Sequence, residues 1–136
     1  MNKKILTGTL IGIILISIFG FWASSFFLFE SPKELIIKKE CDYEGLRKVV
    51  MYELNGNAVT NGTIHISASD CFENKIENFE LIFTVSSPKI ETSDINFEWK
   101  SFDTLTIKYN KKLEIFKQKT ESETVNPKII FEYITK

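Results

Sequence analysis

The chain has few of the residues on which metal centres and disulfide scaffolds depend. Its 136 residues include two cysteines and one histidine. Two cysteines are too few for a disulfide-rich scaffold or a four-ligand zinc site, and one histidine excludes most histidine-based metal centres. Lys and Arg together number 17 against 18 Asp and Glu, so the chain also lacks the basic excess typical of nucleic-acid binding. We therefore expect no metal, no cofactor and no nucleic-acid partner.

Charge is absent from one long stretch near the N-terminus. Residues 5–29 carry no charged side chain, whereas Lys3 and Lys4 precede them and Glu30 follows. At about 1.5 Å per residue, a helix of this length would cross a hydrocarbon layer of about 30 Å. The sequence therefore predicts a cytoplasmic N-terminus at 1–4, a transmembrane anchor at 5–29, a stalk at 30–44 and an extracytoplasmic β domain at 45–136.

The alternative to an anchor is a cleaved signal peptide. Residues 23–25 (ASS) resemble a cleavage site, but the apolar run before them is too long for a signal peptide and continues past them to Phe29. We therefore favour an uncleaved anchor in the cell membrane that crosses it once. The positive-inside tendency places Lys3 and Lys4 in the cytoplasm, although Lys33, Lys38 and Lys39 on the other side weaken this orientation.

Glycines recur along one face of the predicted membrane helix. Gly8 and Gly12 form a G-x-x-x-G pair, and Gly20 lies eight residues further on the same face. Small residues at this spacing let two membrane helices approach closely, so the face could pack against a second copy of the helix. The alternative is that these glycines reflect only the general frequency of glycine in membrane helices.

The pattern of the rest of the chain predicts β-strands. Apolar and polar residues alternate with a period of two in several runs rich in β-branched and aromatic residues, which indicates strands with one buried face. This pattern favours antiparallel pairing. No long helical pattern separates the runs. The one exception is a single helical turn, expected at 70–78 with Asp70 as its cap. The prediction is an all-β domain, a compact antiparallel sheet or small sandwich of six to seven strands. The predicted strands are 46–54, 63–68, 79–85, 95–99, 105–109, 113–117 and 129–134.

Cys41 and Cys71 are candidates for a disulfide bond. A hairpin of strands 46–54 and 63–68 would place the start of the first strand beside the end of the second, and the two cysteines flank those ends. In an oxidising compartment they could form a disulfide, which would stabilise the domain by roughly 3–4 kcal/mol. The alternative is two unrelated small residues. A redox-active pair is disfavoured because the cysteines do not form a C-x-x-C motif.

Two further groups are weaker candidates. His65 alternates with Ile64 and Ile66, so we expect it to face solvent, and no motif supplies the partner acid and nucleophile that catalysis would need. An acidic alternation before the first of these strands could collect calcium, but such runs are more often solvated strand edges. It consists of Glu40, Asp42 and Glu44.

The Phe-rich strands and Trp99 are predicted to form the core and not an exposed aromatic platform.

Part of the domain resembles a family of short, uncharacterised bacterial membrane-anchored proteins. The resemblance rests on residues 45–53 (GLRKVVMYE), 56–60 (GNAVT) and 64–67 (IHIS), followed by Trp99 and residues 103–109 (DTLTIKY). Asn57 and Val59 depart from the glycine and threonine of the family pattern, and Cys41-Asp42 lies where the family has Ser-Pro. The resemblance implies the anchored β architecture and no activity.

The function that we expect from these observations is not enzymatic. An anchor, a β pattern and the absence of a catalytic constellation predict an interaction module that presents a small β domain to a partner protein at the bacterial cell envelope. The alternative is a ligand-binding module for a small molecule or a cell-wall fragment. An open strand edge would favour the first, and an exposed aromatic cluster or a deep pocket would favour the second.

Overall fold

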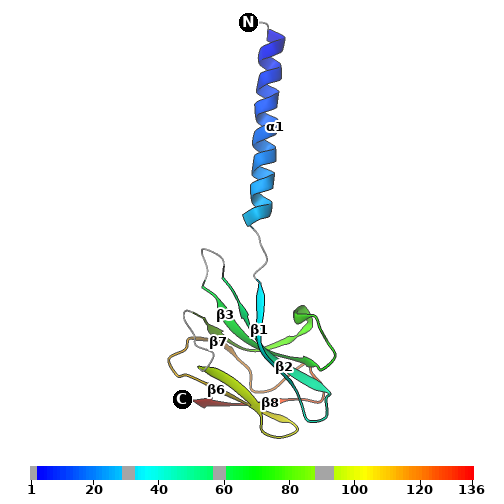
Figure 1. Ribbon diagram of the computed structural model, residues 1–136, viewed down its shortest axis with the longest axis vertical. Coiled ribbons are helices and arrows are strands. Elements are labelled where there is room, and N and C mark those ends of the chain that lie inside the picture. Colours follow the sequence, from blue (N-terminus) through cyan, green and yellow to red (C-terminus); the bar gives the residue numbers. More distant parts are fainter. Residues whose placement is uncertain (1–2, 29–32, 57–60, 88–93) are drawn as a thin grey trace. The chain divides into compact units, whose positions relative to one another are not determined.

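The computed structural model describes residues 3–28, 33–56, 61–87 and 94–136 (Figure 1). The chain divides into two compact units, residues 1–31 and residues 32–136. The first unit contains helix α1 (Lys3–Leu28), whose large apolar side chains are exposed where they are described, between residues 8 and 24. A search over the described residues finds no helix that combines the length and the apolarity needed to cross a membrane.

The second unit is a sandwich of two β-sheets. The larger sheet has the strand order β1-β2-β3-β4-β7 and the smaller sheet has the order β5-β6-β8. A single 3-10 turn, η1 (Ile76–Asn78), lies between β3 and β4. The strands are β1 (Glu34–Cys41), β2 (Arg47–Leu54), β3 (Thr63–Asp70), β4 (Glu80–Ser86), β5 (Ile95–Trp99), β6 (Thr104–Tyr109), β7 (Ile115–Gln118) and β8 (Ile130–Thr135).

The core lies between the two sheets and comes from the alternation seen in the sequence. Ile64 and Ile66 of β3 and Phe97 of β5 are among its buried residues, and Phe83 and Trp99 belong to it as well. The all-β character and the core role of these aromatic residues are therefore confirmed. Because successive side chains of a strand point to opposite faces, one face of each sheet can supply this core while the other faces outward.

Three details of the predicted sheet are wrong. Within the described residues there are eight strands rather than six or seven, and β6 and β8 pair in parallel, from Thr104↔Ile130 to Tyr109↔Thr135. Residues 34–41 lie in the expected stalk, for which only a short strand at 35–37 was considered, and they form the longer edge strand β1, which pairs with β2. The alternation shows which face of a strand is buried. It favours antiparallel neighbours in general but does not fix the direction of any one pair, as β6 and β8 show.

The segment between β3 and β4 holds one helical turn within 70–78, as predicted, but its cap differs from the prediction. Asp70 ends β3 instead of capping a helical turn, and the turn begins six residues later with Lys75 in the capping position. A β-bulge between β3 and β4 pairs Ile66 with Phe83 and Ser67 with Leu81, so that Ile82 and Phe83 are both buried. The prediction had placed these two neighbours on opposite faces. The connection between the predicted strands 46–54 and 63–68 includes residues 57–60, which lie outside the described residues.

Candidate functional site

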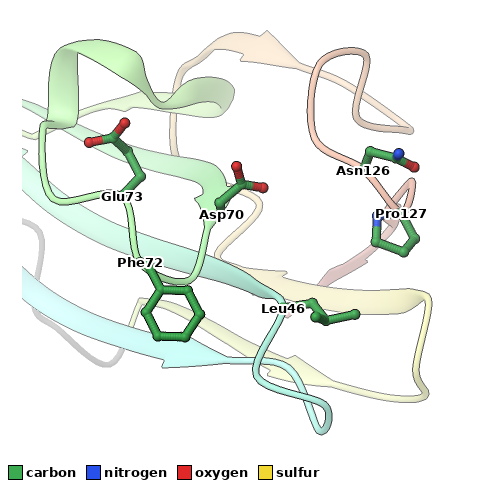
Figure 2. A pocket seen from close by; sticks show the side chains of 6 residues that line it. All are labelled: Leu46, Asp70, Phe72, Glu73, Asn126 and Pro127. Atoms are coloured by element: carbon green, nitrogen blue, oxygen red, sulfur yellow. The ribbon is translucent and has the colours of Figure 1, made fainter.

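A pocket opens at the end of the sandwich where β2 begins and β3 ends (Figure 2). Its volume is about 510 Å³. Figure 2 shows the Asp70 and Glu73 carboxylates directed to one side of this strand end and the Phe72 ring to the other. The pocket is therefore lined by acidic and apolar groups together. Its lining residues are Leu46, Asp70, Phe72, Glu73, Asn126 and Pro127.

The structure joins Cys41 and Cys71 in a disulfide beside this pocket. Their Cα atoms are 5.9 Å apart, and the backbone N–H of Cys71 donates to the carbonyl oxygen of Leu46 over 2.9 Å. The bond ties the end of β1 to the residue that follows β3. It thereby holds in place the loop that carries Phe72.

Arg47 holds the opposite wall of the pocket. This residue, the chain's one arginine, is fully buried at the start of β2. Its Nη1 donates to the carbonyl oxygens of Pro127 and Lys128, each over 3.0 Å, and its Nη2 donates to the carbonyl of Phe102. These bonds connect the larger sheet to the loops before β6 and β8. A planar guanidinium suits this role because its donors reach several acceptors in fixed directions.

Asp42 completes the arrangement around Arg47. Its Oδ2 accepts a hydrogen bond from Arg47 Nε over 2.6 Å, and its Oδ1 accepts one from the backbone N–H of Leu46 over 2.9 Å. Burial opposes ionisation of this carboxyl, but the hydrogen bonds outweigh it and hold the pKa of Asp42 below its ordinary value. A buried charge is tolerated when it is paired and hydrogen-bonded, as it is here.

The acidic side of the pocket is ordered by local hydrogen bonds. Glu73 Oε1 accepts from the backbone N–H groups of Asn74 and Lys75, and Oε2 accepts from Asn78 Nδ2. These bonds lower the pKa of Glu73, so the group is anionic at neutral pH. Asp70, its neighbour in the pocket, is exposed. The two carboxylates on this side suit a cationic group, whereas the Phe72 ring on the other side offers a separate apolar surface.

Several large apolar side chains are exposed around this end of the domain. Phe72 is 85% exposed and Tyr43 is 72% exposed. Leu46 and Phe102 are partly exposed, and the Phe102 ring stacks against the guanidinium of Arg47 with its centre 4.6 Å away. We call these four residues the apolar rim. The segments of Tyr43, Leu46 and Phe102 are held around Arg47, and that of Phe72 is held by the Cys41–Cys71 disulfide.

The acidic alternation does not form a metal site. The described residues contain no group of three or more His, Cys, Asp or Glu side chains that could hold a metal ion. Asp42 is buried against Arg47, whereas Glu40 lies 3.5 Å from Lys38 Nζ on β1. The alternation breaks because β1 ends at Cys41, after which the chain turns.

His65 is less exposed than its strand pattern predicts. It stacks on Tyr52 with ring centres 5.3 Å apart, and its Nε2 lies 2.6 Å from Thr63 Oγ1. Burial lowers the pKa of His65, so the ring is neutral at pH 7. Among the hydrogen bonds that the structure describes, none joins it to a carboxylate. The alternation of His65 with buried Ile64 and Ile66 is as predicted, but His65 is half-buried and not fully exposed, because the Tyr52 ring covers part of it.

The glycine face of α1 stays a prediction. A methyl group placed at Gly8, Gly12 or Gly20 would meet no described atom within 4 Å, so the face is open.

Two residues that sequence reasoning missed are Arg47 and Glu80. Both side chains are charged and yet buried. The sequence marks Arg47 only as the chain's one arginine, and nothing in the sequence distinguishes Glu80 from the other acidic residues.

Comparison of the chain with models of protein families, with curated proteins and with solved structures finds no match. The resemblance to short membrane-anchored proteins thus stays a prediction that rests on residues 45–109.

Proposed function

We propose that this chain is a non-enzymatic interaction module of the bacterial cell envelope, with its β domain outside the cytoplasm and its N-terminal helix as a single membrane anchor. The observation that carries the proposal is the apolar rim. An exposed aromatic cluster was the feature expected of a ligand-binding module, but Tyr43 and Phe102 do not line the pocket, so the rim extends beyond it as a surface that suits a larger partner. Phe72 follows the disulfide-bonded Cys71, and the Tyr43 hydroxyl donates to the carbonyl oxygen of Trp99, so little conformational entropy is lost when a partner covers these exposed rings. Exposed aromatic residues on a fixed base are typical of protein-binding surfaces.

Two features support the membrane and the outer location. The uncharged run at 5–29 follows two lysines, and the described apolar side chains of α1 are exposed, which suits an apolar surrounding. The Cys41–Cys71 disulfide fits an oxidising compartment, since cytoplasmic thiols are kept reduced.

Thiol labelling of intact cells tests the location. Cells that produce the full chain are treated with a membrane-impermeant maleimide, with and without prior reduction, and denatured lysates report the total thiol. We expect labelling of intact cells only after reduction. Labelling that requires lysis even after reduction would contradict an extracytoplasmic domain.

Photo-crosslinking in the same cells tests the interaction. A benzophenone amino acid is placed at position 72, and a matched control has it at position 116, where Phe116 is exposed on β7. We expect one discrete adduct from position 72 and none from position 116. Equal adduct patterns from the two positions, or no adduct from position 72, would rule out the rim as the binding surface.

The pocket favours a second candidate function, the binding of a ligand with an ammonium group, such as a cell-wall fragment. Asp70 and Glu73 would supply the negative charge for the ammonium group, and Phe72, on the other side of the strand end, would contact an apolar part of a larger ligand. Titration of the chain with muramidase-digested cell wall, followed by NMR, tests this. Saturable binding that D70N/E73Q weakens about tenfold, the loss of about 1.4 kcal/mol, would support it; no shift at millimolar fragment would exclude it.

A further inference from the structure

The two sheets end in four edge strands, and three of these edges are closed or short. Strand β5 is closed by side chains: Lys38 Nζ donates to the carbonyl oxygen of Phe97 over 2.6 Å, and the Tyr43 hydroxyl donates to that of Trp99 over 3.0 Å. Such coverage blocks the addition of another strand.

The edges at β8 and β7 are limited in other ways. The backbone N–H of Phe131 donates to Thr120, and Ser122 donates back to Ile129, so residues 120–122 cover the first part of β8. Strand β7 has four residues and offers little edge. Within the described residues, β1 is therefore the one long edge that stays open.

Strand β1 pairs with β2 on one side only. The backbone N–H of Asn55, which follows β2, donates to the carbonyl oxygen of Lys33, and the N–H of Asp42 donates to the carbonyl oxygen of Arg47. The backbone groups of Lys33 and Asp42 therefore face β2. Backbone direction alternates along a strand, and the bulge at Ile37 shifts this alternation by one residue. As a result, the N–H and C=O groups of both Glu34 and Lys39 face away from β2.

We propose that β1 pairs antiparallel with β1 of a second copy of this chain, about a two-fold axis between Ile36 and Ile37. The charges of residues 33–40 (KELIIKKE) match this arrangement. Glu34 faces Lys39 of the other copy and Lys33 faces Glu40, and symmetry repeats each pair. The pairing places β2 of each copy behind β1 and forms one continuous sheet of ten strands.

The backbone and the side chains agree with this register. Glu34 and Lys39 both offer outward backbone groups, as a hydrogen-bonded pair requires. Their partners on β2 are Leu54 and Val50, which lie on one face of the sheet, so the two charged side chains meet on the same side. Ile36, which is more than half exposed, becomes covered at the axis.

Other arrangements of the same strand fit worse. Parallel pairing in register places each charge opposite its own copy. A shift that moves the axis by one residue toward the N-terminus places Lys33 opposite Lys38. Like charges directly opposite destabilise a strand pair, so charge disfavours these two arrangements. Within the described residues, neither Glu34 nor Lys39 takes part in an ion pair of its own domain, so both are available.

Charge exchange in the full chain tests the proposal. Donor- and acceptor-labelled chains are mixed in a mild non-ionic detergent, and energy transfer reports association. We expect E34K and K39E each to weaken self-association at least about tenfold, because each creates two facing pairs of like charge. A mixture of E34K with K39E chains restores opposite charges at both positions and should associate as well as the original chain. The double variant E34K/K39E should also associate with itself.

Controls separate this interface from pairing through α1. The matched variants E77K and K111E change the same charges at exposed positions outside β1 and should leave association unchanged. Circular dichroism verifies that each variant is folded. Association that persists unchanged in E34K, a mixture that associates no better than its components, or an original chain that stays monomeric would each overturn the proposal.

Discussion

Arg47 Nε lies 2.6 Å from Asp42 Oδ2, and neither side chain has any exposed surface. This buried pair joins the turn before β2 to β2 itself, while the rest of the guanidinium binds loops of the smaller sheet. One side chain therefore bridges the two layers of the sandwich at the end where the pocket opens.

R47M should destabilise the domain severely. The substitution leaves Asp42 charged, buried and without its partner, and it removes the donors of three backbone carbonyls, so we expect a loss of about 3–5 kcal/mol. The exposed pair of Lys100 and Glu132 provides the control, because K100M should cost about 1 kcal/mol or less. Denaturant unfolding followed by circular dichroism measures both. Equal losses in the two variants would contradict the bridging role.

Acid should weaken the domain through Glu80. Burial of this carboxylate opposes ionisation, but backbone N–H groups of Thr124 and Glu123, together with Lys119, lower its pKa from 4.5 to about 2. Because the folded value lies below the unfolded one, the stabilisation is complete above about pH 4.5 and is lost as pH falls to about 2. It amounts to about 3 kcal/mol at neutral pH.

The variant E80Q tests this pH dependence. It should be about 3 kcal/mol less stable than the original chain at pH 7 and nearly equal to it close to pH 2. Glu77 is exposed in η1, so E77Q should follow the original curve throughout. A constant difference between E80Q and the original chain across this range would show that Glu80 acts through shape and not through charge.

Reduction of the disulfide should lower the free energy of unfolding by roughly 3–4 kcal/mol. The cross-link closes a loop with a sequence separation of 30 residues and so restricts the unfolded chain. Unfolding curves with and without reductant measure the effect. The variant C41S/C71S should have the lower stability in both conditions. If reductant weakens that variant equally, the effect of reductant does not come from this bond.

Phe72 and Phe83 should differ sharply when truncated. Phe72 is 85% exposed, so F72A should change the free energy of unfolding by about 0.5 kcal/mol or less. Phe83 is fully buried in the core, and F83A should cost about 3–5 kcal/mol. Thermal unfolding of the two variants is a direct comparison. A large loss in F72A would mean that the ring supports the fold and is not kept for a partner.

Much of the sandwich follows from local pattern. The alternation in β3 and β5 predicted both the strands and the residues that form the core, because a sheet with one buried face imposes a period of two. The same rule misassigned Ile82, since a bulge inserts one residue and reverses the alternation after it. A bulge depends on the neighbouring strand, so it has no signature within β4 alone.

The site was harder to predict than the strands. The Cys41–Cys71 pairing could be anticipated because a hairpin brings its two ends together, and the structure places the bond there. The role of Arg47 could not, because its acceptors come from Phe102, Pro127 and Lys128, more than 50 residues further along the chain. Contacts of this range depend on how the two sheets stack, which the pattern of a single strand does not contain.

The coverage of β5 by Lys38 and Tyr43 limits how large an assembly can become. A sheet with open edges on both sides can add copies indefinitely and grow into a fibre. Here, across the described residues, the opposite edge of the larger sheet is the short β7, and both edges of the smaller sheet are either covered or partly covered. Association across β1 would therefore stop at two copies, and the same contacts that close β5 would protect the protein from polymerising.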